Sequence, residues 1–296
     1  MTTPIDLASL DSPDVVEALD FETIFAAMLA DLRLRDPAFD ALVESDPAYK
    51  ILEVCAYREV LLRQRVNDAA KSVMLAYAGG SDLDHLAALY GVQRMVIDPG
   101  DPTAVPPVAE TLESDTALRR RVQMAPESWT TAGSVGSYQF HAMSAHPGIK
   151  DVAVSSPAPG EVLVTVLAAS GDGTPAADIL AAVEQALDAD TVRPLCDGVT
   201  VRAADVVRYQ VAAELVLFSG PDAEVVRSAA EAAVTMYVTD QHRFGRDVAM
   251  SGLIAALHQP GVARVLLASP TADILLDHGQ VAYCDDIDIT MTLRDG

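Results

Sequence analysis

Histidine and cysteine are the side chains that most often bind metals or act as nucleophiles, and in this chain they are scattered. There are six histidines: His85, His141, His146, His242, His258 and His278. None forms an HExxH pair or lies at zinc-ligand spacing from a cysteine, and His141 and His146, five residues apart, fall on different faces of a helix. Cys55, Cys196 and Cys284 contain no CxxC pair, which indicates reduced thiols in a protein folded in a cytosol. We therefore predict no metal site and no redox centre.

Two short stretches could hold a cation or a phosphate. Asp285, Asp286 and Asp288 form an acidic cluster, but no glycine or glutamate follows at the spacing of a calcium loop, and DDIDITMT alternates as a strand does. The glycine-rich stretch SGDGTPAAD, residues 170–178, could place a phosphate at a helix N-terminus. It lacks the lysine of a P-loop, and Thr174–Pro175 is explained as the cap of the following helix. We predict no cofactor.

Covalent catalysis has no support in the sequence either. A nucleophile elbow needs GxSxG after a strand, and GSVGS at residues 133–137 has a different spacing. A pair of catalytic carboxylates stays an open alternative, because 43 aspartates and glutamates offer many pairs and geometry is needed to choose one. We therefore predict a protein that is not an enzyme, with a carboxylate-dependent hydrolase as the alternative.

The overall charge argues against nucleic acid and membranes as partners. Forty-three acidic and twenty basic residues leave a formal charge of −23, which repels phosphate groups. No stretch approaches the ~20 apolar residues of a membrane span. The first residues, MTTPIDLASLDSPDVV, have neither the basic nor the apolar region of a signal peptide. We expect a folded protein that is made in the cytoplasm and whose partners are other proteins.

The element best suited to hold such contacts is a long helix in the first third of the chain. Asp46 and Pro47 are an N-cap and a first-turn proline, and Gly79 and Gly80 are the next helix-ending residues. This pattern predicts a helix over residues 48–78, about 46 Å long at 1.5 Å per residue.

Two shorter helices flank the long one. Asp20, or less favourably Thr23, can cap FETIFAAMLADLRLR before it. Ser81 can cap LDHLAALY behind it, with Asp84 in the position of a capping box and Gly91 at the end.

The long helix carries an apolar stripe, and the last five of its residues have coiled-coil spacing. The stripe is formed by Ile51, Cys55, Leu62, Val66, Ala69, Val73 and Ala76. The polar residues beside it have two interpretations. In one, the helix is an ordinary solvated element with pairs such as Glu59–Arg63. In the other, it packs among other chains, with arginines on partner carboxylates and an asparagine fixing the register. The candidate interface residues are Arg58, Leu62, Arg63, Arg65, Val66, Asn67 and Val73.

The rest of the chain divides into three segments. Residues 96–148 begin with the proline-rich VIDPGDPTAVPPVAETLES, which predicts an extended linker, and end in a helical connector. From residue 149 the apolar period changes to two, and strands alternate with helices. We predict an α+β fold with a helical region at residues 1–95. Two small α/β sandwiches with mixed or antiparallel sheets follow at residues 149–206 and 207–296.

The block VCAYREVLLRQRVNDAAKSVMLAYAGGSDLDHLAALYGV, residues 54–92, resembles the baseplate assembly J proteins of temperate contractile-tail phages. Further stretches fit the same family in the same order: PDVVEALDFETI, SPAP, GDGTPAADIL, RPLCDGVTV, RFGRD and QVAYCDDIDIT. The resemblance covers nearly the whole chain. It departs at Cys55, where a polar residue is expected, and around the linker at residues 96–114.

The resemblance implies a structural protein of the baseplate wedge, carried in the virion and without enzymatic activity. It implies two copies of the chain joined to one partner wedge protein, the I protein, in a helical core bundle near the sheath-initiating W protein. It further implies six wedges around the hub and spike, with the C-terminal α/β domains dimerising and linking neighbouring wedges into a ring. The alternatives are the tail-associated hydrolase named above and a transient assembly factor absent from the mature particle.

Overall fold

The computed structural model describes residues 5, 7, 10–11, 13, 19–130, 132–220 and 222–293. Most of the N-terminal stretch considered for a signal peptide, and the first part of PDVVEALDFETI, lie outside these residues. Within the described part of the chain, no helix is both long and apolar enough to cross a membrane. The chain forms two compact units, one of residues 3–95 and 112–123 and the other of residues 96–111 and 124–296.

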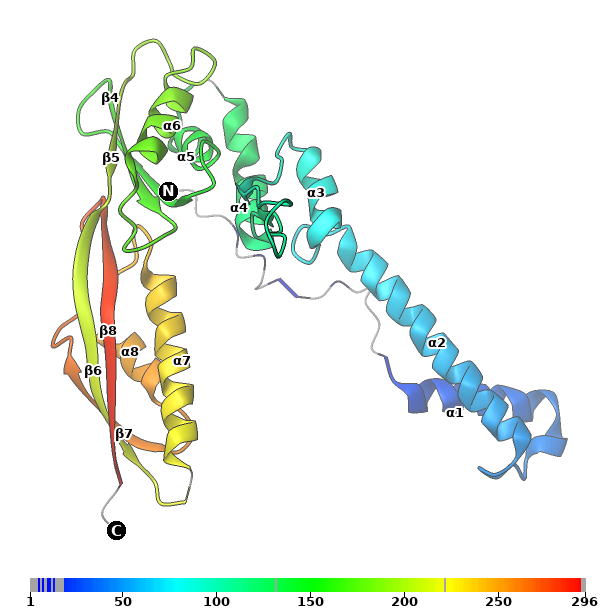
Figure 1. The fold of residues 1–296 in the computed structure, drawn as a ribbon. Helices are drawn as coiled ribbons and strands as arrows, with labels where there is room; N and C mark the ends of the chain where they lie inside the picture. Colours follow the sequence, from blue (N-terminus) through cyan, green and yellow to red (C-terminus); the bar gives the residue numbers. More distant parts are fainter. Residues whose placement is uncertain are drawn as a thin grey trace. The chain divides into compact units, whose positions relative to one another are not determined.

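The first unit is helical and begins with a helical hairpin (Figure 1). Helix α1 (Phe21–Arg35) starts at the predicted Asp20, whose carboxylate accepts a hydrogen bond from the Glu22 amide at 3.1 Å. A short 3₁₀ turn, η2 (Pro37–Phe39), leads to α2 (Pro47–Ser72), which starts at the predicted Asp46 and Pro47. The two helices pack through Ile24 and Phe25 of α1 against Ala56 of α2, all buried.

Helix α2 ends earlier than the sequence predicts. It has 26 residues and stops at Ser72, about 39 Å from its start, so the predicted boundary at residue 78 is wrong. In the turn that follows, the Arg119 guanidinium, from α4, donates hydrogen bonds to the carbonyls of Leu75 and Ala78 at 2.7 and 2.6 Å. These carbonyls are therefore satisfied without a continued helix.

Helix α3 (Gly80–Ala88) follows directly, and its N-cap is Gly79 instead of the predicted Ser81. The Gly80 amide, at the first turn, donates to the Asp115 carboxylate at 3.1 Å, so an acid from another helix does the capping. Gly91, at φ 72°, ends the segment as predicted, because it adopts the left-handed conformation that glycine tolerates best.

Helix α4 (Asp115–Met124) completes the helical unit through a buried ion pair. Arg121 and Glu113 lie 2.6 Å apart with side chains only 6 and 8 % exposed. Arg121 also donates to the Gln93 carbonyl at 2.6 Å, and Glu113 accepts the Met95 amide at 3.1 Å. The pair thus joins the start of α4 to the segment that follows α3.

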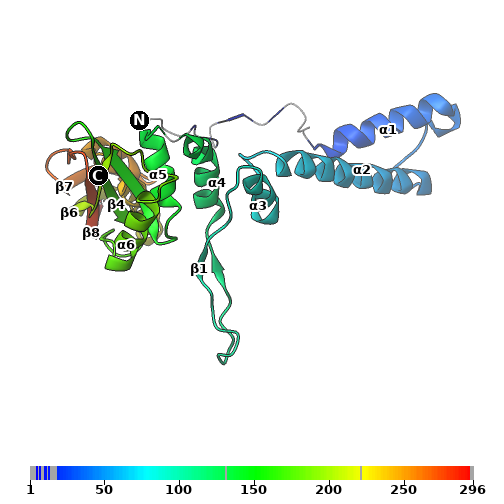
Figure 2. The same ribbon diagram turned by 90° about the horizontal axis from the view of Figure 1, so that it is seen from above.

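Residues 96–112 form a two-stranded ribbon where the sequence predicts an extended linker (Figure 2). Strand β1 (Val96–Asp98) pairs with β2 (Thr111–Leu112), and Asp101 and Val108 form a further antiparallel bridge. The segment is extended, as the sequence predicts, and its antiparallel pairing is the feature that the sequence did not indicate. Almost all of the ribbon is exposed, and Val105 near its tip is 97 % exposed, so local hydrogen bonds hold it without a core.

The second unit contains a central sandwich. It opens with a 3₁₀ turn, η3 (Ala125–Trp129), and α5 (Val135–Met143). Strands β3 (Ile149–Ser155), β4 (Glu161–Ala168) and β5 (Gly198–Ala203) follow in the sheet order β3-β4-β5, antiparallel and then parallel. Helix α6 (Ala177–Leu187) crosses between β4 and β5; its N-cap is Ala176, not the predicted Thr174–Pro175. Helices α5 and α6 share one core with the sheet.

The C-terminal sandwich also packs two helices against a three-stranded sheet, and two of its strands are longer, at 13 and 14 residues (Figure 1). Its elements are β6 (Asp205–Leu217), α7 (Ala223–Gln241), α8 (Met250–Leu257), β7 (Val262–Ser269) and β8 (Gln280–Leu293). The sheet order is β7-β6-β8, antiparallel and then parallel. Alternate residues of β6 are buried under α7 and α8. The predicted α+β fold, a helical region followed by two small sandwiches with mixed sheets, is confirmed.

Candidate assembly surface

The acidic cluster at residues 285–288 and the glycine-rich loop at residues 170–178 are the two stretches that could hold a ligand. Both form ion pairs with the same arginine. Arg208 bonds Asp285 of β8 at 2.5 Å and also pairs with Asp172 of the glycine-rich loop, while its guanidinium lies over the Tyr283 ring. The Asp172 carboxylate also accepts the Thr174 amide at 3.0 Å, and this hydrogen bond lowers its pKa. These contacts tie the two sandwiches together. No cluster of three or more metal-binding side chains occurs among the residues that the structure describes.

Burial shifts the pKa of two histidines and one cysteine. His242 is buried at the end of α7, its Nδ1 lies 2.7 Å from the Ala282 carbonyl, and burial lowers its pKa. Burial likewise lowers the pKa of His141 and raises the pKa of the Cys284 thiol. A raised thiol pKa means little thiolate and hence little reactivity.

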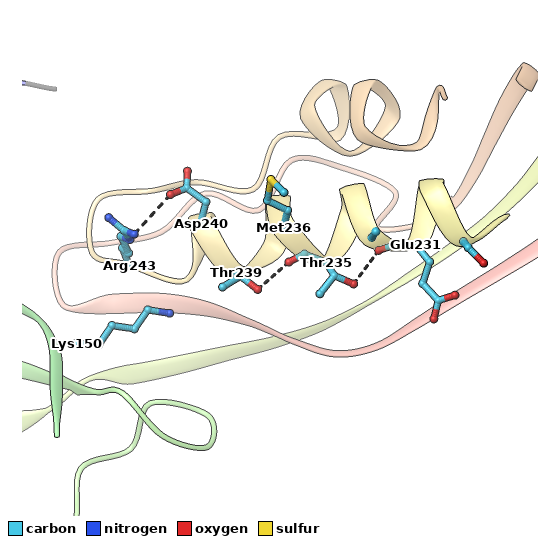
Figure 3. Close-up of a pocket in the computed structure, with 9 residues that line it drawn as sticks. Lys150, Glu231, Thr235, Met236, Thr239, Asp240 and Arg243 are labelled. Carbon is cyan, nitrogen blue, oxygen red and sulfur yellow. Dashed lines mark hydrogen bonds and ion pairs between the residues drawn. The ribbon is translucent and has the colours of Figure 1, made fainter. Parts of the chain in front are cut away.

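A groove with a volume of about 720 Å³ lies along α7 and is lined by side chains of this helix together with Lys150 and Arg243 (Figure 3). Its two threonine hydroxyls, of Thr235 and Thr239, donate to carbonyls one turn earlier on the same helix. Arg243 lies 3.7 Å from Asp240, and burial together with the nearby Arg243 charge lowers the pKa of Lys150.

The outer side of α2 carries several exposed apolar side chains. Leu62, Val66 and Val73 are 65, 60 and 67 % exposed. At 100° per residue, they belong to a strip about 120° wide that lies opposite the buried Ala56. We call it the outer stripe, and its residues, all exposed, are Ile51, Val54, Cys55, Arg58, Leu62, Arg65, Val66, Ala69 and Val73. Monomeric proteins rarely leave a contiguous apolar strip of this length open, which indicates an interaction surface.

Two of the five basic residues of α2 lie on the outer stripe, and none of its three acids does. Arg58 and Arg65 lie on the outer stripe, whereas the acids of the helix, Glu53, Glu59 and Asp68, project outside its arc. The outer stripe therefore combines apolar and basic side chains in a chain with a net charge of −23.

Two of the seven predicted interface residues lie elsewhere on the helix. Asn67 is buried, only 4 % exposed, and lies three turns from Ala56 on the same side. Arg63 is half-buried and bonds Glu59 at 2.6 Å, the pair expected of an ordinary helix surface. The structure thus places Arg58, Leu62, Arg65, Val66 and Val73 together on the outer stripe and separates Arg63 and Asn67 from them.

Sequence reasoning missed the apolar residues of the first half of the outer stripe as interface candidates. Val54 is 61 % exposed and Ile51 is 63 % exposed, because α1 covers only the opposite side of α2. Their spacing from Leu62 places them on the same side of a helix, and this spacing was the signal in the sequence that could have identified them.

These features define a class: an α+β protein whose candidate site is a docking surface on a long helix. The chain matches the models of the Baseplate J-like N-terminal domain at residues 44–101, the Baseplate J-like central domain at residues 130–203 and the Baseplate J-like protein C-terminal domain at residues 209–290. It is 46 % identical over 289 residues to Baseplate protein J of Escherichia phage P2, covering 95 % of this chain and 96 % of the relative. The chain therefore belongs to the baseplate J family, as the resemblance of residues 54–92 predicts.

A solved assembly shows a more distant likeness. A chain of the anti-feeding prophage baseplate matches 60 % of this chain and 43 % of its own length, with a TM-score of 0.42 and 19 % identity. The family membership stands on the domain models and on the phage P2 relative. Its members are structural proteins of baseplates, and this is the role that the chain fills.

Proposed function

We propose that the chain is a structural component of the baseplate wedge of a contractile phage tail and that the outer stripe joins a helix of a partner wedge protein in a shared bundle. The observation that carries this proposal is the exposure of Leu62 and Val66 along one side of the 26-residue helix α2, continued by the exposed Val73 at its C-cap. Helices with such a stripe gain stability when a second helix covers it, at roughly 1.5–3 kcal/mol for each large side chain that becomes fully buried.

The arginines of the outer stripe give this docking its selectivity. Arg58 and Arg65 are exposed among apolar residues, where a partner helix would bring its own side chains within reach. A guanidinium binds a carboxylate through two parallel hydrogen bonds, so a partner with acids at matching positions is favoured over one without them. The surplus of acids on the rest of the chain repels further copies and keeps unassembled chains apart.

The proposed partners follow from the family. They are the wedge protein I, the sheath-initiating protein W and a second copy of the chain within each of six wedges. The C-terminal domains link neighbouring wedges into a ring around the hub and spike, which the chain meets indirectly. The chain assembles in the host cytoplasm and ends in the tail baseplate of the virion. The phage P2 relative, named Baseplate protein J and matched over almost its full length, supports this proposal.

The test is a double substitution, Leu62→Glu with Val66→Glu, on the outer stripe. Loss of two buried side chains removes about 3–6 kcal/mol of binding, so we expect co-purification with the I protein to weaken at least 100-fold. Circular dichroism should show unchanged helix content, because both residues are exposed in the single chain.

The matched control is Tyr57→Glu, which adds an acid at an exposed apolar position of α2 outside the outer stripe. It should co-purify normally. Equal binding by the double variant and the wild-type chain would contradict the docking role of the outer stripe. Detection of the chain in finished particles separates a wedge component from a transient assembly factor.

A further inference from the structure

Strand β5 lies at the edge of the central sheet, and its outward backbone groups have no partner in the described part of the chain. It pairs with β4 alone, in six consecutive parallel pairs without a register shift. The amides of Gly198 and Ala204 donate towards β4 at 2.7 and 2.9 Å. Because backbone groups alternate in direction along a strand, the N–H and C=O groups of Val199, Val201 and Ala203 point to the open side.

Little protects this edge from a further strand. Edge strands are commonly blunted by proline, by a bulge or by a charged side chain. Strand β5 contains no proline, and its one charged residue is Arg202. The Arg202 guanidinium donates to the Thr165 hydroxyl of β4 at 3.3 Å, so this side chain crosses the sheet away from the open side. The opposite edge strand, β3, has a register shift at Lys150.

A groove of about 550 Å³ lies between β5 and the helix α6. It is lined on one side by Ala181, Glu184 and Gln185 of α6 and on the other by Val199 and Val201 of β5. The two valines are partly buried against the core that α6 shares with the sheet. An extended segment in this groove would form hydrogen bonds with the backbone of β5 and direct alternate side chains towards α6.

The charges of the groove favour a basic segment. Arg193 pairs with Asp188 at 3.2 Å, and both line the groove. The exposed Glu184 carboxylate has no ion-pair partner in the part of the chain that the structure describes. A lysine or arginine on the bound segment would place its positive charge beside this carboxylate.

The exposed extended stretches of this chain have the opposite charge. The ribbon at residues 96–112 carries three acids and no lysine or arginine, and the same holds for β8. Like charges brought together at a contact disfavour it. A different protein with a basic segment therefore fits the groove better than a second copy of this chain.

We propose that the groove between β5 and α6 binds an extended, basic segment of a different protein, which adds a fourth strand to the central sheet. The three outward residues of β5 offer three donors and three acceptors to this strand, and Glu184 selects its basic side chain. This inference goes beyond the proposed function, because it assigns a second docking site. The outer stripe on α2 receives a helix and lies in the other compact unit.

The test uses the full-length chain and a short synthetic peptide of alternating lysine and valine. Hydrogen exchange read by mass spectrometry reports on the backbone of β5. We expect the peptide to slow exchange at the amides of Val199, Val201 and Ala203, seen as a loss of up to three deuterons in residues 198–204. The same peptide methylated at every amide nitrogen has no donors for strand pairing and should neither bind nor protect. A peptide of alternating glutamate and valine should not bind either.

Two variants separate the two parts of the recognition. Val201→Pro removes an outward N–H of β5, at a position where an edge strand tolerates proline. Glu184→Lys reverses the charge at an exposed position of α6 and leaves β5 unchanged, so it decides the test if the proline variant does not fold. Each should weaken binding of the lysine peptide at least about fivefold, as expected for the loss of one hydrogen bond or ion pair. The control Glu110→Lys makes the same charge change in the ribbon and should bind as the wild type does.

Three results would overturn the proposal. Binding of the lysine peptide without protection of the three amides would show adsorption to an acidic surface alone. Wild-type affinity in Glu184→Lys would show that this carboxylate does not select the segment. Protection of the same amides in concentrated chain without peptide would identify a second copy as the occupant.

Discussion

Replacing Arg121 by methionine tests whether a buried ion pair holds the helical unit together. The guanidinium makes two bonds to Glu113, at 2.8 and 2.6 Å, and one to the Gln93 carbonyl at 2.6 Å. Methionine keeps much of the apolar stem of arginine and removes all three donors. The Glu113 carboxylate then stays buried with the Met95 amide as its remaining bond from this network.

The expected loss is large because a charge would be left buried without its counterion. Removing one partner of a buried pair typically costs about 3–5 kcal/mol, compared with less than about 1 kcal/mol for an exposed pair. For a unit of about 100 residues, 3 kcal/mol corresponds to a fall in Tm of roughly 12–24 °C.

Hydrogen exchange read by mass spectrometry locates the effect. Peptides of α3 and α4 should lose protection in Arg121→Met, whereas peptides of β4 and β6, in the other unit, should exchange as in the wild type. The double variant Glu113→Gln with Arg121→Met removes the orphaned charge and keeps an acceptor for the Met95 amide. It should recover at least half of the lost stability. A cost below about 1 kcal/mol for Arg121→Met, or a double variant no more stable than the single one, would refute the reasoning.

Two further predictions concern the second unit. His242 has a lowered pKa in the folded chain because it is buried, so its contribution to stability is complete above the unfolded pKa of about 6.5 and is lost as the pH falls below it. Urea unfolding at pH 7.5 and 5 should show this loss, at most about 1.4 kcal/mol per pH unit for one proton, and His242→Gln should reduce it. Replacing residues 99–109 with a two-residue turn should change stability by no more than about 0.5 kcal/mol in thermal unfolding, because the ribbon tip is exposed. A clearly larger loss would mean that the ribbon packs on the chain in solution.

The start of α2 was predictable and its end was not, for one physical reason. Asp46 and Pro47 act within the first turn, so the sequence beside them carries the signal. The end at Ser72 depends on Arg119, more than forty residues further on, which satisfies carbonyls that would otherwise favour another helical turn. Local patterns contain no trace of such a distant donor. The ribbon at residues 96–112 escaped prediction likewise, because its prolines and short strands leave no period to detect.

The sequence was sufficient to predict which side of the helix carries the candidate interface. It was not sufficient to predict every residue on that side. The spacing of Leu62, Val66 and Val73 placed them on one side, and they are exposed together. Asn67 lies next to Val66 in the sequence, yet a helix turns 100° per residue, so it points to the buried side. Which side of α2 is buried follows from the packing of α1, a tertiary contact that periodicity does not contain.

The helical unit is held together by residues that its outer stripe does not include. Ala56 packs against α1 on the opposite side of α2, and the Arg121–Glu113 pair lies beyond the end of this helix. Since the apolar side chains of the outer stripe contribute little to the core of the single chain, substitutions there should leave its stability nearly unchanged and act on assembly. Arg121→Met should instead lower the stability of the unit and affect binding only through unfolding. We therefore expect a variant of the outer stripe to unfold at the wild-type Tm and to fail to assemble. We expect an Arg121 variant to unfold at a lower Tm and still to assemble at low temperature. This pair of results would show that docking and folding depend on different residues.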